Sequence, residues 1–71
     1  MHNPSTNDRH TAYYDAVCAA DADLHDAIAH VVAEQDAGRI SLAEAAVERV
    51  GLLTRHLDRL EQLRRDLLGG S

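Results

Sequence analysis

The sequence predicts an all-α protein: an antiparallel two-helix hairpin that we expect to dimerise into a four-helix bundle. Two long stretches without proline carry apolar residues at three- and four-residue steps. A glycine followed by a helix-start pattern separates these stretches. The 71 residues include two tyrosines, no phenylalanine or tryptophan and a single cysteine. Neither large rings nor a disulfide can therefore complete the small core, which favours stabilisation by association.

The N-terminal part of the chain predicts a flexible arm followed by a long helix. Residues 1–10 hold the only proline and a cluster of polar residues, which is typical of an arm. The first helix is expected over about 11–37. Its apolar residues follow one stripe at helical spacing, formed by Tyr13, Val17, Ala20, Leu24, Ala27, Ile28 and Val31. The acidic residues of this stretch lie outside that stripe or at its edge.

Two independent signals place a turn at residues 38–41. Gly38 follows the last periodic residues and can take the left-handed conformation that ends helices. Ser41 and Glu44 have the spacing of a capping box, in which their side chains satisfy the free amides of a new helix. So short a connection predicts that the two helices are antiparallel neighbours.

The second helix is expected over about 42–68, with 69–71 as a C-terminal tail. Its main apolar stripe comprises Leu42, Ala46, Val50, Leu53, Leu57, Leu60, Leu67 and Leu68. With Leu52, His56 and Leu63 beside it, the apolar arc covers roughly half the helix circumference at about 100° per residue. One neighbouring helix covers less, so we expect the surplus around these three residues to form a second contact surface. The predicted partner interface is Val50, Leu52, Leu53, His56, Leu57, Leu60, Leu63 and Leu67.

Gly51 raises an alternative, because a glycine inside a helix is unfavourable by about 1 kcal/mol relative to alanine. Residues 43–52 resemble the first helix and turn of a DNA-binding helix-turn-helix motif. A small DNA-binding regulator of this kind would need a turn at Gly51. However, Val47 stands where the motif's packing demands a small residue, and the apolar stripe passes Gly51 without losing phase. The net charge of −5 also argues against binding to a phosphate backbone.

The histidines suggest a weaker alternative, a metal-binding helical bundle. His25 and His30 have carboxylates at helical spacing, but they lie about 140° apart on the helical wheel. One helix cannot direct both at the same ion, so the sequence predicts no metal site within a single chain. His56 borders the surplus apolar surface, and in an antiparallel hairpin it falls opposite Asp21.

The remaining sequence features favour a binding role over catalysis. We find no phosphate-binding loop, dinucleotide fingerprint or zinc-finger spacing, and Cys18 has no catalytic neighbours at helical spacing. We therefore expect no enzyme activity, no cofactor and no metal. The N-terminus lacks a signal-peptide core and no run of about 18 apolar residues exists, which predicts a cytoplasmic protein. The expected function is a helical-hairpin adaptor, regulator or assembly subunit that forms a homodimer or binds a partner helix.

Overall fold

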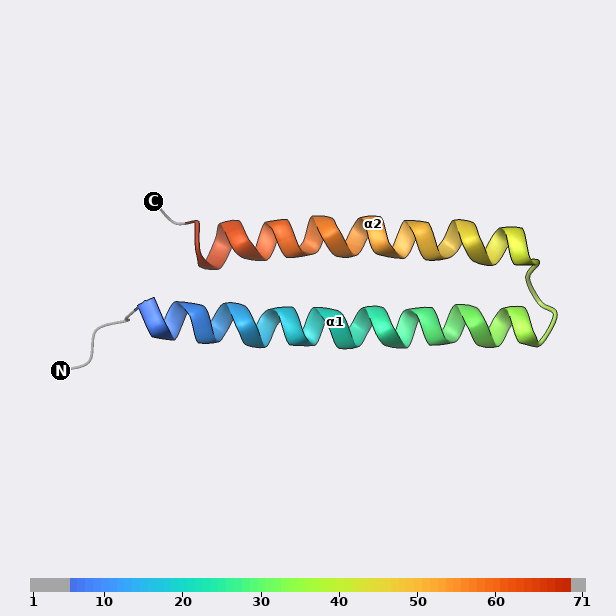
Figure 1. Ribbon diagram of the computed structural model, residues 1–71, viewed down its shortest axis with the longest axis horizontal. Helices are drawn as coiled ribbons and strands as arrows, with labels where there is room; N and C mark the ends of the chain where they lie inside the picture. The colour runs from blue at the N-terminus through green and yellow to red at the C-terminus, as the bar shows by residue number, and fades with distance from the viewer. Residues whose placement is uncertain (1–5, 70–71) are drawn as a thin grey trace.

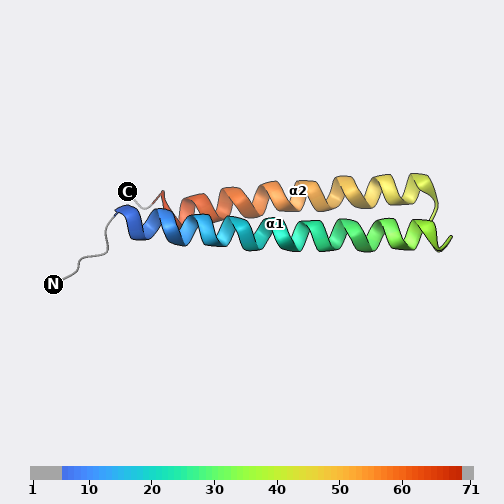
Figure 2. The ribbon, with the colours of Figure 1, turned by 60° about the horizontal axis from the view of Figure 1, so that its bottom comes forward.

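The computed structural model describes residues 6–69, which form two helices. Helix α1 spans Thr6–Asp36 and helix α2 spans Leu42–Leu67. They run antiparallel, and a short turn joins them at one end of the molecule (Figure 1). A view turned by 60° shows that the two helices stay side by side along their length and form a single layer (Figure 2). The predicted all-α hairpin is confirmed.

Helix α1 begins at Thr6, five residues before the expected start at Thr11. The polar segment 6–10 is therefore helical and does not belong to the expected arm, whereas residues 1–5 lie outside the described part of the chain. This segment contains no glycine or proline. Asp8 lies in the first turn, where the positive end of the helix dipole interacts favourably with a carboxylate and stabilises the helix. Each helix ends one residue before its expected end, at Asp36 and Leu67.

Both predicted end signals are present at the turn. Gly38 has a φ of 77°, and its N–H donates to the Gln35 carbonyl at 3.0 Å. The Glu44 N–H donates to the Ser41 hydroxyl at 3.0 Å, and the Ser41 N–H donates to the Glu44 carboxylate at 3.0 Å. This reciprocal pair is a complete capping box. The turn therefore sets the antiparallel direction through local hydrogen bonds.

Replacing each of the two inner glycines by alanine should change stability in opposite directions. Gly38→Ala should destabilise the hairpin by about 1 kcal/mol, because a side chain at positive φ is strained. Gly51→Ala should stabilise it by about 1 kcal/mol, because alanine favours the helix and an added Cβ meets nothing within 4 Å. Urea unfolding monitored by circular dichroism measures both changes. Shifts of the same sign would contradict the prediction.

The capping box should also make stability depend on pH. Hydrogen bonds from the Ser41 backbone and side chain hold the pKa of Glu44 below its ordinary value of 4.5. A lowered carboxylate pKa stabilises the fold above pH 4.5, and this stabilisation is lost as the pH falls through the folded-state pKa. Wild type should therefore lose more stability than Glu44→Gln between pH 7 and pH 3, measured as urea midpoints. Equal losses in the two proteins would count against this role of Glu44.

The core between the helices is small. Among the described residues, the buried apolar side chains are Ala20, Val31 and Ala45, with 1%, 4% and 0% of their surface exposed. None of them is larger than valine. The predicted α1 stripe lies along this core, since Tyr13, Val17, Leu24, Ala27 and Ile28 are half-buried. Among the described residues, a single hairpin therefore leaves six leucine and valine side chains with 40–72% of their surface exposed.

Helix α2 continues without a break through Gly51. The turn that the helix-turn-helix alternative requires at this position is not there, so no second, DNA-reading helix begins after Gly51. Gly51 is a tolerated residue inside one long helix, as the unbroken phase of the apolar stripe predicts.

Candidate interaction surface

The structure divides the apolar arc of α2 differently from the expectation. Buried and half-buried residues recur at three- and four-residue steps along one side of α2, namely at Ala45, Arg49, Leu52, His56, Leu60, Leu63 and Leu67. Leu52 and His56 line a shallow groove together with Ala20, Leu24 and Ala27 of α1. The expected second contact surface around Leu52, His56 and Leu63 is therefore on the side that α2 turns toward α1.

His56 and Asp21 link the two helices, as the antiparallel register predicts. The Nε2 atom of His56 lies 3.0 Å from Oδ1 of Asp21, and 11% of the His56 side chain is exposed. The Asp21 side chain is largely in contact with water. The pair gives the imidazole a polar partner at the edge of the interhelical contact.

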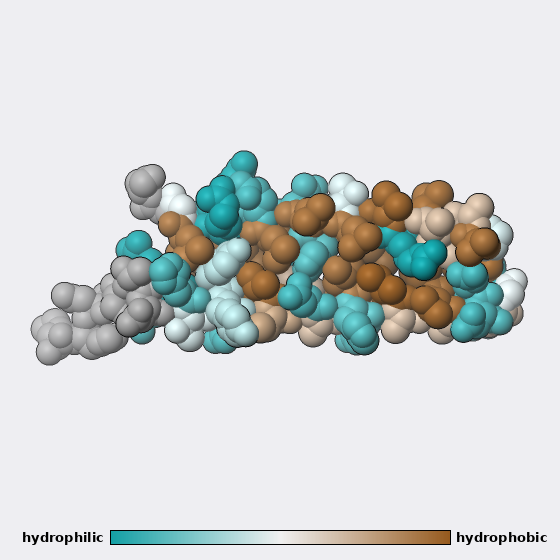
Figure 3. All heavy atoms as spheres, viewed as in Figure 1, coloured by the Kyte–Doolittle hydropathy of each residue, from teal (hydrophilic) through white to brown (hydrophobic). Residues whose placement is uncertain are grey.

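The apolar side chains of α2 that α1 does not cover lie next to the contact between the two helices. Val50, Leu53 and Leu57 of α2 keep 63%, 45% and 64% of their surface exposed. They adjoin apolar residues of α1 and of the start of α2. We call this set the apolar face: Ile28, Val32, Leu42, Val50, Leu53 and Leu57. Figure 3 shows hydrophobic side chains gathered over both helices on one broad side of the molecule.

Helical geometry explains why both helices contribute to one side. At about 100° per residue, Val50, Leu53 and Leu57 lie roughly 100° around α2 from its contact with α1. Ile28 and Val32 lie about as far around α1 from its contact with α2, in the same rotational sense. Because the helices are antiparallel, residues rotated by equal angles in the same sense around the two helix axes lie on the same broad side. The apolar face therefore includes side chains of both helices.

The predicted interface set is split between two surfaces. Its exposed members, Val50, Leu53 and Leu57, belong to the apolar face. Its half-buried members are Leu52, His56, Leu60, Leu63 and Leu67. The set omitted Ile28 and Val32, although Ile28 belonged to the expected α1 stripe and Val32 follows it four residues later. That i, i+4 spacing was the available signal for a second apolar strip on α1.

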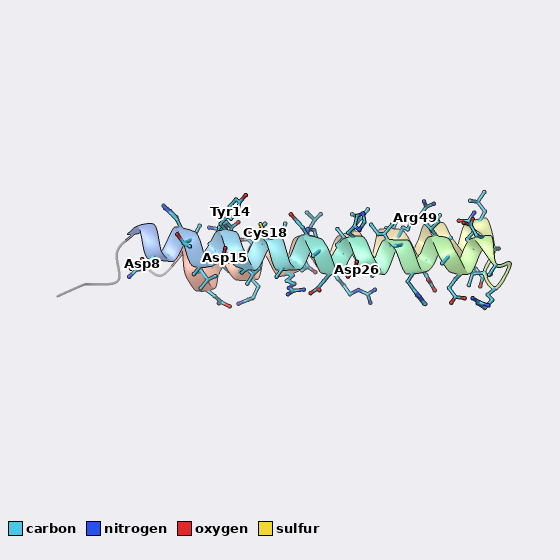
Figure 4. All side chains as sticks on the ribbon, turned by 90° about the horizontal axis from the view of Figure 1, so that it is seen from below. Asp8, Tyr14, Asp15, Cys18, Asp26 and Arg49 are labelled. Atoms are coloured by element: carbon cyan, nitrogen blue, oxygen red, sulfur yellow. The ribbon has the colours of Figure 1, made fainter. Side chains whose placement is uncertain are left out.

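Arg49 carries a charge on the same broad side. It is half-buried, and within residues 6–69 it makes no ion pair. Seen from below, Arg49 of α2 and Tyr14 of α1 project from one edge of the hairpin, whereas Asp26 lies toward the other (Figure 4). A partner that covers the apolar face must leave the guanidinium a path to water or give it an acceptor.

The opposite broad side is polar. There Arg59 Nη1 donates to Asp23 Oδ2 at 3.0 Å, and His30 Nε2 lies 3.6 Å from Glu34 Oε1. Exposed pairs of this kind contribute about 0–1 kcal/mol each, so they add little to stability. The contrast between the two sides leaves one broad surface suited to bury apolar area.

Among residues 6–69, no three His, Cys, Asp or Glu side chains lie close enough together to hold a metal ion. Neither helix in this range has an apolar stretch that could cross a lipid bilayer. Comparisons of the chain with protein-family models, with curated proteins and with solved structures find no match. The geometry of the hairpin is therefore the basis for a functional assignment.

Proposed function

We propose that this chain is a non-enzymatic protein–protein interaction module: an adaptor, regulator or assembly subunit that docks its apolar face on another helical surface. The observation that carries the proposal is the exposure of Val50, Leu53 and Leu57 beside a core of three small side chains. Contiguous apolar surface on one side of a small protein is typical of an interaction site. A second hairpin on this face would complete a four-helix bundle.

The energies support association over an isolated hairpin. Full burial of a valine or leucine side chain contributes about 1.5–3 kcal/mol. Covering the exposed parts of Val50, Leu53 and Leu57 therefore contributes on the order of 3–5 kcal/mol per copy. Small domains are stable by only about 5–15 kcal/mol, so this amount is a large share of the total. A partner supplies the core that two helices alone do not build.

Sedimentation equilibrium of the purified chain tests the proposal. We expect the mass to rise above the 7.8 kDa of the monomer as the concentration increases, together with the melting temperature. Mass action produces this coupling when only the associated form has a complete core. A monomer at every concentration, with a sharp melting transition that does not depend on concentration, would contradict the proposed function.

A further inference from the structure

The exposed apolar side chains of the apolar face are concentrated toward the turn. Leu42, Val50 and Leu53 lie in the first half of α2, and Val32 lies close to the turn in α1. Charged residues occupy the second half of α2, including the ion pair of Arg64 with Glu61. Figure 3 shows the same trend, since the hydrophobic surface is broadest over the half of the hairpin that holds the turn. The face therefore has an apolar end and a charged end.

The dimensions of the face fit a second two-helix layer. The hairpin is one helix layer thick and two helices wide, and each helix with its side chains is about 10 Å wide. Over the length of α2, about 39 Å, the broad side therefore measures roughly 800 Å². One partner in a stable protein–protein interface buries about 800 Å². A single helix, about 10 Å wide, would cover only half of this side, whereas a second hairpin covers all of it.

We infer that a second copy of the chain docks on the apolar face with both turns at the same end, so that α1 of each copy lies against α2 of the other. This inference rests on the proposed function and adds the partner and its direction. Two hairpins can stack with their turns at the same end or at opposite ends. The same-end arrangement places the apolar end of each copy, with Val32, Leu42 and Val50, against the apolar end of the other.

The opposite-end arrangement is less favourable for two reasons. It places Leu42 of one copy at the level of the Arg64 region of the other, so the Arg64–Glu61 pair loses water against an apolar surface. It also places α1 against the α1 of the other copy. Seven carboxylates and one arginine make α1 strongly acidic, whereas α2 has five arginines and five carboxylates. The same-end arrangement sets the acidic helix against the neutral one.

Distances between spin labels test the direction of docking. Cys18 is the only cysteine and is exposed, so Cys18→Ser gives a background for single labels. In that background we would label Ala37→Cys beside the turn and, as a control, Thr54→Cys near the middle of α2. Same-end docking predicts a separation below about 30 Å for the Ala37→Cys labels. Opposite-end docking predicts about 40 Å or more for these labels, because the turns are then a helix length apart. The control gives a short distance in both arrangements.

The outcomes separate this inference from the proposed function. Short distances at both positions support a same-end dimer. A short Thr54→Cys distance with a long Ala37→Cys distance overturns the inference and leaves the proposed function standing. No dipolar signal at either position, with a monomeric mass of the labelled protein at the same concentration, means that a second copy is not the occupant and overturns the inference. The proposed function itself fails only with the concentration-independent monomer described above.

Discussion

Val31→Asp is expected to unfold the hairpin. Val31 is the largest buried side chain of the described core, with 4% of its surface exposed. An aspartate there would place a carboxylate between the helices without a hydrogen-bond donor, which costs several kcal/mol. That loss is comparable to the whole stability of a small domain. The helical circular-dichroism signal at 222 nm should fall to a small fraction of the wild-type value at 25 °C.

The neighbouring residue provides a matched control. Val32 has the same side chain, but 40% of its surface is exposed on the apolar face. Val32→Asp should keep its helical signal at high protein concentration. On dilution, it should lose this signal at a higher protein concentration than wild type does. If the two variants unfold alike at high concentration, the assignment of Val31 to the core and Val32 to the interface is wrong.

Leu57→Glu is expected to abolish association at concentrations where wild type associates. Leu57 keeps 64% of its surface exposed in the single hairpin, so glutamate fits there without disturbing the core. In a symmetric pair each copy loses the burial of the exposed part of one leucine, which together amounts to about 2–4 kcal/mol. The dissociation constant should therefore rise by roughly 30- to 10³-fold. Sedimentation equilibrium over a range of concentrations measures this change.

Ala19→Glu is the control for the added charge, because Ala19 is an exposed residue on the polar broad side of α1. This variant adds the same carboxylate to the chain and should leave the dissociation constant within about threefold of wild type, since distant surface changes alter free energy by about 0.5 kcal/mol. Equal weakening by both variants would point to net charge as the cause. An unchanged constant in Leu57→Glu would exclude Leu57 from the interface.

The sequence was sufficient for the parts of the fold that depend on local signals. Apolar periodicity predicted two long helices, and Gly38 with the Ser41–Glu44 capping box located the turn. The antiparallel direction followed from the length of that turn, and it correctly placed His56 opposite Asp21. The first turn of α1 was missed, because the polar residues at 6–10 have no apolar periodicity by which a helix could be recognised.

The candidate surface was only partly predictable. The sequence identified the surplus of apolar residues on α2 and included Val50, Leu53 and Leu57, which the structure leaves exposed, in the predicted partner interface. It did not distinguish the strip that faces α1 from the strip that stays open, because both recur at the same three- and four-residue steps. The apolar periodicity of a single helix cannot distinguish between two neighbouring strips of similar hydrophobicity.

The sequence by itself therefore determined that this chain is a two-helix hairpin with more apolar surface than one hairpin can bury. Only the tertiary structure decided which surface that is. Ala20 and Ala45 are small enough for the two helices to approach closely, and this contact turns Leu52 and His56 toward α1. With α2 in this orientation about its axis, Val50, Leu53 and Leu57 lie on the same broad side as Ile28 and Val32. The physical reason is that the fit between two helices, which depends on residues far apart in the sequence, sets the rotation of each helix about its axis.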